Sequence, residues 1–363
     1  MKKVLIISYY YPPMPAVGGL RAQGLVKYLP EFGWQPTVVH GELATRGTLV
    51  HKLFAINPNQ NLLAQAEELK RKIGGLPIDH LLKLYAEYFA YPDTAAKWGA
   101  EIINTKMGDA NDFDAIISTS SPVSCHTVAS AFKHEYDIPW IADFRDLWTL
   151  NHYYPYSRRR KAKEMQLELE TLRYATALTT VSEPLSVCLS QFHHRFVHTI
   201  LNGYDPQELN QGTPLTEEFT ITHTGNIYKG KQNPEELFKT WQGKDVLIRF
   251  YGTYYAWIDT LAKKYGMENK VKQYGWVSHK EALQRQRESR MLLYLKWNDP
   301  EQEGIYGAKL FEYLATKRPI ISIGRADSYV DKVITDANWE NIEPYSQRVM
   351  ASKFADLLDQ KGR

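Results

Sequence analysis

The charged segment Asp143-Phe-Arg-Asp146 carries the side chains best suited to acid–base chemistry. It follows Pro139–Ala142, a short apolar run typical of a buried strand. Because buried charges must be paired, these groups either face a ligand or form an Arg–Asp network that fixes the loop. An arginine stays protonated, so Arg145 would bind charge or position an acid. Asp143 or Asp146 could accept the proton of a hydroxyl group.

A second group of residues could bind a diphosphate. Gly304-Ile-Tyr-Gly307 is a glycine-containing turn that leads into a predicted helix with Lys309 and Glu312. A helix N-terminus after such a turn attracts anions. Glu312, one turn into the helix, could accept hydrogen bonds from a ribose diol, as acidic residues do in other Rossmann-like sites. The alternative is a solvated helix carboxylate.

Glycines also separate the first expected strand, Val4–Ser8, from the first expected helix, Arg21–Phe32. At this place Gly18 and Gly19 would let backbone N–H groups approach an anion. The alternative is a simple glycine turn into a helix. The pattern is not GxGxxG, which disfavours a nicotinamide-dependent dehydrogenase.

Short apolar runs alternate along the chain with segments long enough for crossover helices. One series ends at Ala177–Val181 and a second begins at Phe219. Such alternation predicts parallel sheets covered on both faces, and two series predict two doubly wound α/β domains. Ligands bind beyond the carboxyl ends of the strands of such sheets, where the charged segment and the glycine turns are expected.

Composition changes predict the domain boundaries. The polar stretch that contains Pro206, Gly212 and Pro214 has the character of a linker. We expect an N-terminal Rossmann-like domain over 1–205, in which 51–92 is an insertion forming a cleft wall, a linker over 206–218, a second Rossmann-like domain over 219–343, and a terminal helix over 344–363 that packs back on the N-terminal domain.

Motifs in a characteristic order extend over most of the chain. They are Val4-Leu-Ile-Ile-Ser-Tyr-Tyr-Tyr-Pro-Pro, Gly18-Gly19-x-Arg21, Pro92-Asp93-(x4)-Trp98, Phe113 to Pro122, Pro139 to Trp148, Thr180-Val-Ser182-Glu183, Ile200 to Asp205, Gly225-Asn-Ile-Tyr228, Tyr251-Gly252, Tyr274-Gly275-x-Val277 and Gly307 to Ile320. The chain thereby resembles the retaining, nucleotide-sugar-dependent glycosyltransferases of family four. That resemblance implies the GT-B architecture, in which two Rossmann-like doubly wound domains face a cleft. It also implies transfer of a sugar in cell-surface polysaccharide or glycan biosynthesis.

The resemblance implies a set of donor-binding residues: Gly225, Lys231, Gly252, Val277, Glu303, Gly307, Lys309 and Glu312. In the family, a Glu at the place of Glu312 holds the nucleotide ribose, and a Glu eight positions earlier contacts the donor sugar. Here that earlier position is Gly304. The family often has an Arg where this chain has Asn226, and Lys229 competes with Lys231 for the diphosphate.

The acceptor and diphosphate side is expected to contain Gly18, Gly19, Arg21, Ser182 and Asn202, with Asp143, Arg145 and Asp146 as the catalytic group. Arg145 stands where many relatives have a histidine. Retaining members of the family are thought to use front-face displacement, in which the donor phosphate helps to take the acceptor proton. No dedicated nucleophile is then needed.

We expect no metal and no cofactor other than the nucleotide-sugar donor itself. Asp112-Phe-Asp114 has the DxD pattern but precedes a strand, at the wrong end of the sheet, and His193, His194 and His198 lack a zinc-site spacing. The net charge of +3 is far from that of a nucleic-acid binder. Cys125 and Cys188 lie far apart outside any CxxC, which is typical of a cytoplasmic protein.

A basic segment begins one predicted helix and contains Arg158, Arg159, Arg160, Lys161 and Lys163. Cations are unfavourable at a helix N-terminus, so an anionic membrane surface or a lipid-linked acceptor could compensate. A solvated helix start is the alternative. We find no stretch of 18 apolar residues and expect no membrane-spanning helix.

The expected partners are therefore a nucleotide-sugar donor and a glycan or lipid-linked acceptor. Peripheral contact would occur at the inner face of the membrane. Two other functions remain open: a nucleotide-sugar epimerase of the same fold, and a non-catalytic binding subunit of a glycan assembly complex.

Overall fold

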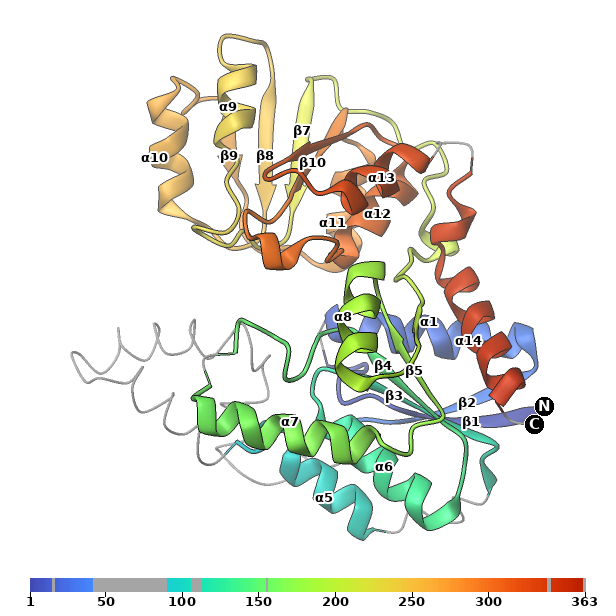
Figure 1. Cartoon of the computed structure of the whole chain (residues 1–363). Helices are drawn as coiled ribbons and strands as arrows, with labels where there is room; N and C mark the ends of the chain where they lie inside the picture. Colours follow the sequence, from blue (N-terminus) through green and yellow to red (C-terminus); the bar gives the residue numbers. More distant parts are fainter. Residues whose placement is uncertain (15–16, 42–89, 106–111, 155, 338–340, 362–363) are drawn as a thin grey trace. The chain divides into compact units, whose positions relative to one another are not determined.

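The computed structural model describes residues 1–14, 17–41, 90–105, 112–154, 156–337 and 341–361 (Figure 1). Most of the expected insertion, 51–89, lies outside these residues. The chain divides into two compact units, one of Met1–Ile200 with Ala351–Arg363 and the other of Leu201–Met350. Among the described residues, no helix is long and apolar enough to cross a membrane.

Unit 1 contains a six-stranded parallel sheet. In the sheet order β2-β1-β3-β4-β5-β6, the strands are Trp34–Val39, Lys2–Ile7, Ala115–Ser120, Trp140–Phe144, Ala177–Thr180 and Val197–Thr199. The inner strands β3, β4 and β5 are buried along their whole length, as is typical of a parallel sheet covered on both faces. The order changes direction between β1 and β3, so ligands are expected beyond the carboxyl ends of these two strands.

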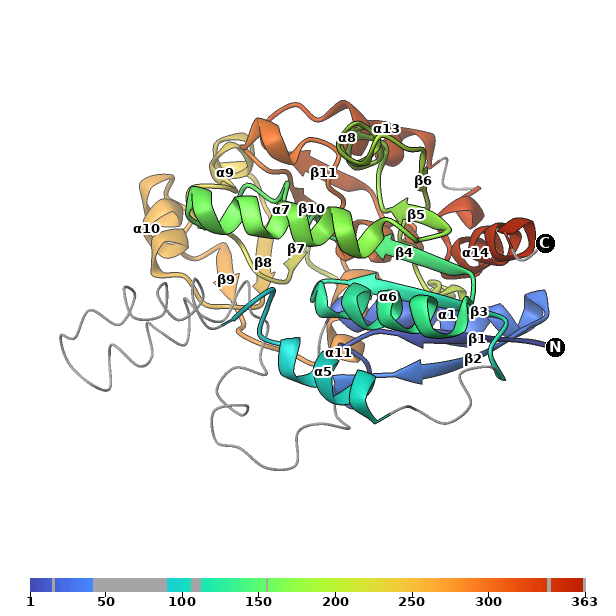
Figure 2. The same ribbon diagram turned by 60° about the horizontal axis from the view of Figure 1, so that its bottom comes forward.

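Helices cover both faces of this sheet. They are α1 (Leu20–Tyr28), α5 (Ala96–Asn104), α6 (Ser124–Tyr136), α7 (Arg158–Leu172), α8 (Glu183–His193) and the end of α14 (Gln347–Lys361). Figure 1 shows α6 and α7 on one face and α1 on the other, and α5, α6 and α7 stand in front of the sheet in Figure 2. Right-handed crossovers account for this separation, because the chain winds in opposite directions from β1 and from β3.

The last helix, α14, contributes to unit 1 from Ala351 onward. The guanidinium of Arg21 lies 5.1 Å from the ring centroid of Phe354, and Lys2 forms an ion pair of 2.8 Å with Asp359. The side chain of Phe354 is fully buried, so apolar packing provides most of this attachment.

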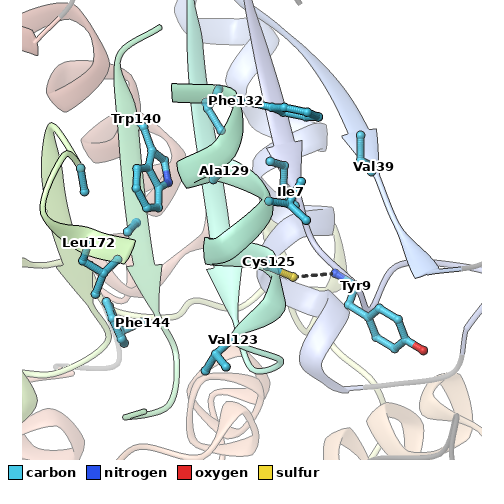
Figure 3. Close-up of a cluster of buried hydrophobic side chains, with 14 of the residues drawn as sticks. Ile7, Tyr9, Val39, Val123, Cys125, Ala129, Phe132, Trp140, Phe144 and Leu172 are labelled. Atoms are coloured by element: carbon cyan, nitrogen blue, oxygen red, sulfur yellow. Dashed lines mark hydrogen bonds between the residues drawn. The ribbon is translucent and has the colours of Figure 1, made fainter. Parts of the chain in front are cut away.

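Large aromatic side chains fill the core between the sheet and α6 (Figure 3). Trp140 donates its indole N–H to Ser118 Oγ at 2.7 Å, which satisfies a polar group that burial would otherwise penalise. The thiol of Cys125 is buried nearby and accepts a hydrogen bond of 3.3 Å from the backbone N–H of Tyr9. Both cysteines are free thiols.

Unit 2 contains a five-stranded parallel sheet. In the sheet order β11-β10-β7-β8-β9, the strands are Ile320–Ile323, Met291–Leu295, Thr220–Thr224, Leu247–Tyr251 and Val271–Gln273. Its helices are α9 (Glu235–Trp241), α10 (Ala256–Lys264), α11 (His279–Arg287), α12 (Ala308–Thr316) and α13 (Ser328–Asp336).

The boundary between the units lies at Ile200, earlier along the chain than the linker expected over 206–218. That stretch packs within unit 2. Asn210 bonds the carbonyls of Ala315 and Thr316 at 3.1 and 2.7 Å, and Thr216 N–H donates to Glu288 O at 2.9 Å. Its polar composition therefore reflects side chains and backbone that hydrogen-bond to the surface of unit 2.

Candidate functional site

Two glycines bring the loops after β7 and β8 into direct contact. Gly225 has φ +96° and Gly252 has φ +146°, conformations that favour glycine. A Cβ atom on Gly252 would lie 2.5 Å from the carbonyl oxygen of Gly225, so only glycine fits there. The Gly252 N–H donates to Gly275 O at 2.8 Å, which links the loop after β9 to the same place.

Lys309, in the first turn of α12, reaches over Gly225. A Cβ atom on Gly225 would lie 2.9 Å from Lys309 Nζ. Among the described residues no carboxylate lies within ion-pair distance of this ammonium, whose pKa is lowered to about 8 by burial, against the opposing effect of Glu312. A desolvated cation without an acidic partner is a ready site for an anion.

Glu312 lies one turn further along α12. Its Oε1 atom is 3.0 Å from His279 Nε2, and its Oε2 atom accepts a bond of 3.0 Å from Gln286 Nε2. Burial acts to raise the pKa of Glu312, but the hydrogen bond and charge of His279, with Gln286 and Lys309, hold it below its ordinary value. The hydrogen bond to Glu312 in turn raises the pKa of His279. Glu312 is therefore an ionised hydrogen-bond acceptor fixed from two sides.

The turn before α12 is held by hydrogen bonds from its backbone N–H groups to neighbouring side chains. Gly304 has φ +72°, and its N–H donates to Asp327 Oδ2 at 2.9 Å. A glutamate at position 304, where the resemblance leads us to expect one, would be strained in this conformation. Glu303 accepts a bond of 3.4 Å from Ser328 Oγ, and the Gly307 N–H donates to Tyr294 Oη at 3.3 Å.

The remaining expected donor residues lie around the loops of unit 2. The backbone of Lys231 donates to Tyr228 O at 2.9 Å and accepts from Asn298 N–H at 2.8 Å, and burial lowers the pKa of its amine. Val277, in the loop after β9, is half-buried. Asn226 accepts a hydrogen bond of 2.8 Å from Thr253 Oγ1, so its side chain connects the loop after β7 to the loop after β8.

In unit 1, Asp143 is fully buried and its carboxylate is saturated. Arg21 donates to both oxygens at 2.8 Å, and Thr119 and Thr179 donate at 2.9 and 2.7 Å. Arg21 is itself buried and also donates to Ile200 O at 2.9 Å. The expected proton-acceptor role of Asp143 and ligand role of Arg21 do not fit this geometry, because the two side chains form a closed ion pair.

Arg145 fixes the glycine loop of unit 1. Its guanidinium donates to the carbonyls of Gly18 and Ser121 and, through Nε, to Thr119 Oγ1 at 3.2 Å. A Cβ atom on Gly18 would lie 2.7 Å from Arg145 Nη1, so the close approach requires glycine. A Cβ atom on Gly19 would lie 3.0 Å from Tyr10 O. Arg145 and Gly18 therefore form one structural group, and Tyr10 lies close to both glycines.

Asp146 is exposed, unlike Asp143. Burial raises the pKa of its carboxyl group, against the opposing effects of Arg145 and of a backbone hydrogen bond from Ser121. Because Asp146 forms no ion pair within the described residues, it is the carboxylate of this segment that remains available to a substrate. Ser182 is buried at the N-cap position of α8 but makes no capping bond, and its Oγ atom has no hydrogen-bond partner within the described part of the chain. Asn202 is half-buried and belongs to unit 2 rather than to the N-terminal domain in which we expected it.

Arg160 differs from the other residues of the basic segment. It is buried, pairs with Glu164 at 2.6 Å, and lies 4.7 Å from the ring centroids of Tyr91 and Tyr156. The expectation that Arg160 contacts a membrane is therefore wrong, because its charge is already neutralised inside unit 1. Arg158, Arg159, Lys161 and Lys163 are exposed.

Three residues of the unit 2 site were not predicted: His223, His279 and Gln286. Ser278 caps α11 by accepting a bond of 3.2 Å from the Glu281 N–H, and this Ser-x-x-Glu pattern predicts a helix start at His279. No local pattern pairs His279 with a residue of α12. Within the described residues, no group of three or more His, Cys, Asp and Glu side chains is placed to hold a metal ion.

Comparisons with known proteins define the fold class. No family model matches the chain, and no curated protein matches it in sequence. Among solved structures, sucrose-phosphate synthase from Thermosynechococcus elongatus is similar with a TM-score of 0.63, 11% identity and 99% of each chain covered. HepE from Anabaena in complex with UDP-glucose follows with a TM-score of 0.60 at 13% identity, covering 99% of this chain and 100% of that one.

A UDP-N-acetylglucosamine 2-epimerase described as putative, from Listeria monocytogenes, is similar with a TM-score of 0.55 and 13% identity, covering 99% of this chain and 96% of that one. These similarities and the two Rossmann-type parallel sheets confirm that the chain has the GT-B architecture.

Proposed function

We propose that this protein transfers a sugar from a nucleotide-diphosphate sugar to a glycan or lipid-linked acceptor. The observation that carries the proposal is the ammonium of Lys309, which lies over Gly225 at the N-terminus of α12 without an acidic partner among the described residues. A helix N-terminus with a cation beside it matches the charge of a diphosphate.

Glu312 completes a nucleotide site next to that cation. Its ionised carboxylate, held by His279 and Gln286, would accept hydrogen bonds from the ribose hydroxyls. Similarity to HepE, which was crystallised with UDP-glucose, supports a uridine nucleotide as the first candidate. Gly252, Val277, Glu303 and Lys231 would line the rest of the donor site.

The chemical step would place a developing negative charge on the leaving diphosphate. Lys309 and the backbone N–H groups that begin α12 would stabilise this charge without a metal ion. We propose a retaining, front-face displacement of a hexosyl group, in which the leaving phosphate helps to take the acceptor proton. Asp146 and the loop held by Arg145 would contact the acceptor, and the biological product would be a cell-surface polysaccharide or related glycan.

Isothermal titration with UDP, GDP, ADP and UDP-glucose tests the nucleotide site. We expect one nucleotide to bind and Lys309→Ala and Glu312→Gln each to weaken it by about tenfold or more, equivalent to about 1.4 kcal/mol. The matched controls Lys332→Ala and Glu236→Gln change exposed side chains on α13 and α9 and should bind as the wild type does.

Product analysis separates the alternatives. Incubation of the bound nucleotide sugar without an acceptor would yield an epimer if the protein were an epimerase. A folded protein that binds none of the nucleotides would contradict the proposal and favour the non-catalytic binding subunit.

A further inference from the structure

The imidazole of His223 lies beneath the Lys309 ammonium. His223 belongs to β7 and is almost fully buried, with its Nδ1 atom 2.9 Å from Leu293 O on β10. Its other ring nitrogen, Nε2, lies 3.4 Å from Lys309 Nζ. A carbonyl can only accept, so Nδ1 must carry the proton that forms the first bond. In the neutral ring, Nε2 then presents its lone pair to Lys309.

The electrostatics agree with a neutral imidazole. Burial, and then the neighbouring charge of Lys309, hold the pKa of His223 well below 6.5, although the carbonyls of Leu293 and Asn226 act in the opposite direction. The imidazole is therefore neutral at physiological pH. A neutral acceptor suits an ammonium, whereas an imidazolium would repel it.

Lys309 lies where an anion could bind, so its contact with His223 can affect anion binding. Lys309 Nζ lies within 2.9 Å of where a Cβ atom on Gly225 would be, and no acid within the described residues pairs with it. A lysine side chain has many rotamers, and an unpaired one would lose considerable conformational entropy on binding an anion. An acceptor beneath the ammonium reduces that loss by holding it in place before the anion arrives.

We propose that His223 is a positioning residue for Lys309, and that its Nε2 lone pair holds the ammonium over Gly225, where the diphosphate of the donor would bind. This inference rests on the proposed function for its ligand. The contact between the two side chains can also be tested without any ligand.

Among the described residues, few titratable groups surround Lys309, so a change in its titration midpoint can be assigned to the substitution of His223. The titratable groups around it are His223 on β7, Tyr294 on β10 and Glu312 on α12, with His279 of α11 bonded to the far side of Glu312. Burial raises the pKa of Tyr294 to about 12, so this group stays neutral across the test range. Glu312 favours the Lys309 ammonium and is unchanged in the His223 variants.

Three proteins should be compared: the wild type, His223→Gln and His223→Phe. Glutamine keeps an oxygen acceptor near the place of Nε2, whereas phenylalanine fills the space and offers none. The full chain, labelled with 13C at lysine Cε, is titrated by NMR, and Lys309 is assigned with the Lys309→Arg variant. Because the acceptor favours the ammonium, we expect His223→Phe to lower the titration midpoint of Lys309 and His223→Gln to leave it near that of the wild type.

Binding of UDP, measured by calorimetry at pH 7, provides the second readout. We expect His223→Phe to weaken binding about tenfold and His223→Gln less than threefold. Wild-type affinity should fall as the pH rises through the Lys309 midpoint. An unchanged midpoint and unchanged UDP affinity in His223→Phe would overturn the inference.

The outcomes distinguish the positioning role of His223 from the proposed nucleotide binding. If the wild type does not bind UDP but the Lys309 midpoint shifts in His223→Phe, the positioning role stands and the nucleotide proposal fails. If His223→Phe does not fold, 15N NMR of the wild-type imidazole decides the question. An unprotonated Nε2 with a protonated Nδ1 supports the inference, and a protonated Nε2 overturns it.

Discussion

The side chains of Glu312 and His279 form a contact of 3.0 Å that joins α12 to α11, and each shifts the pKa of the other toward the charged form. The residue best placed for a ribose is thus already hydrogen-bonded before any ligand arrives. Gln286 bonds both Glu312 Oε2 and Thr224 Oγ1, which ties this carboxylate to β7 as well.

This pair makes a testable contribution to stability. A raised His279 pKa stabilises the fold fully below the ordinary value near 6.5, and this stability is lost as the pH rises through the folded pKa. A lowered Glu312 pKa stabilises the fold above its ordinary value of 4.5, and this stability is lost as the pH falls. We expect His279→Ala to cost about 0.5 kcal/mol near pH 6, because His279 is half exposed, and less at pH 8.5.

Differential scanning calorimetry of the wild type and His279→Ala at the two pH values measures this difference. An equal loss at pH 6 and pH 8.5 would show that a neutral hydrogen bond, not the charge of His279, stabilises the contact.

The contact of Gly252 with Gly225 predicts a strict requirement for glycine. Gly252→Ala would place a Cβ atom 2.5 Å from Gly225 O in an unfavourable backbone conformation. We expect a loss of about 2 kcal/mol or more, together with weaker nucleotide binding, because the loop under Lys309 must move. Gly243→Ala is the matched control: its φ is +74° and no atom of the described residues lies within 4 Å of the new Cβ, so only about 1 kcal/mol is expected. Urea denaturation measures both values, and similar losses would contradict the steric argument.

Asp143 and Asp146 should respond differently to the same substitution. Asp143→Asn removes the carboxylate charge that pairs with the buried guanidinium of Arg21 and is expected to cost about 3–5 kcal/mol. Asp146→Asn changes an exposed carboxylate, so its stability should stay within about 0.5 kcal/mol of the wild type.

Urea denaturation and the transferase rate, measured together, separate the two residues. If Asp146 contacts the acceptor as proposed, Asp146→Asn lowers the rate without unfolding the protein. A stable Asp143→Asn variant with a greatly reduced rate would instead restore Asp143 as a proton acceptor.

The exposed basic residues of α7 allow a test of membrane contact. If they bind an anionic surface, the double variant Arg158→Glu/Arg159→Glu should reduce sedimentation with phosphatidylglycerol vesicles severalfold, because each cation near such a surface contributes about 1 kcal/mol. Lys239→Glu/Lys332→Glu reverses two exposed charges in unit 2 and is the control. Equal loss in both double variants would indicate a nonspecific effect of net charge, and no loss in either would remove the hypothesis.

Local patterns were sufficient for the fold class and for much of the unit 2 site. Apolar runs that alternate with amphipathic segments predict parallel sheets, because periodicity depends only on neighbouring residues. Glycine turns before helices predict anion sites for the same reason. Gly225, Gly252, Lys309 and Glu312 were found in this way or from the resemblance, and the structure places Gly225 directly against Gly252 and Lys309.

Pairings between distant residues could not be found from the sequence. Asp143 has the same residue type as Asp146, but it is neutralised by Arg21, 122 positions earlier in the chain. Arg160 stands among exposed cations, yet the turn of α7 directs it inward to Glu164. His223 looks like any strand residue until β10 and α12 place Leu293 O and Lys309 Nζ on its two ring nitrogens.

The sequence by itself thus determined the class of fold and the places where ligands are expected, since both follow from short-range patterns. Only the tertiary structure decided which charged groups remain available for a ligand. Burial and ion pairing determine the free energy of each charged side chain. Both depend on segments that are distant in the sequence and that the sheets bring together.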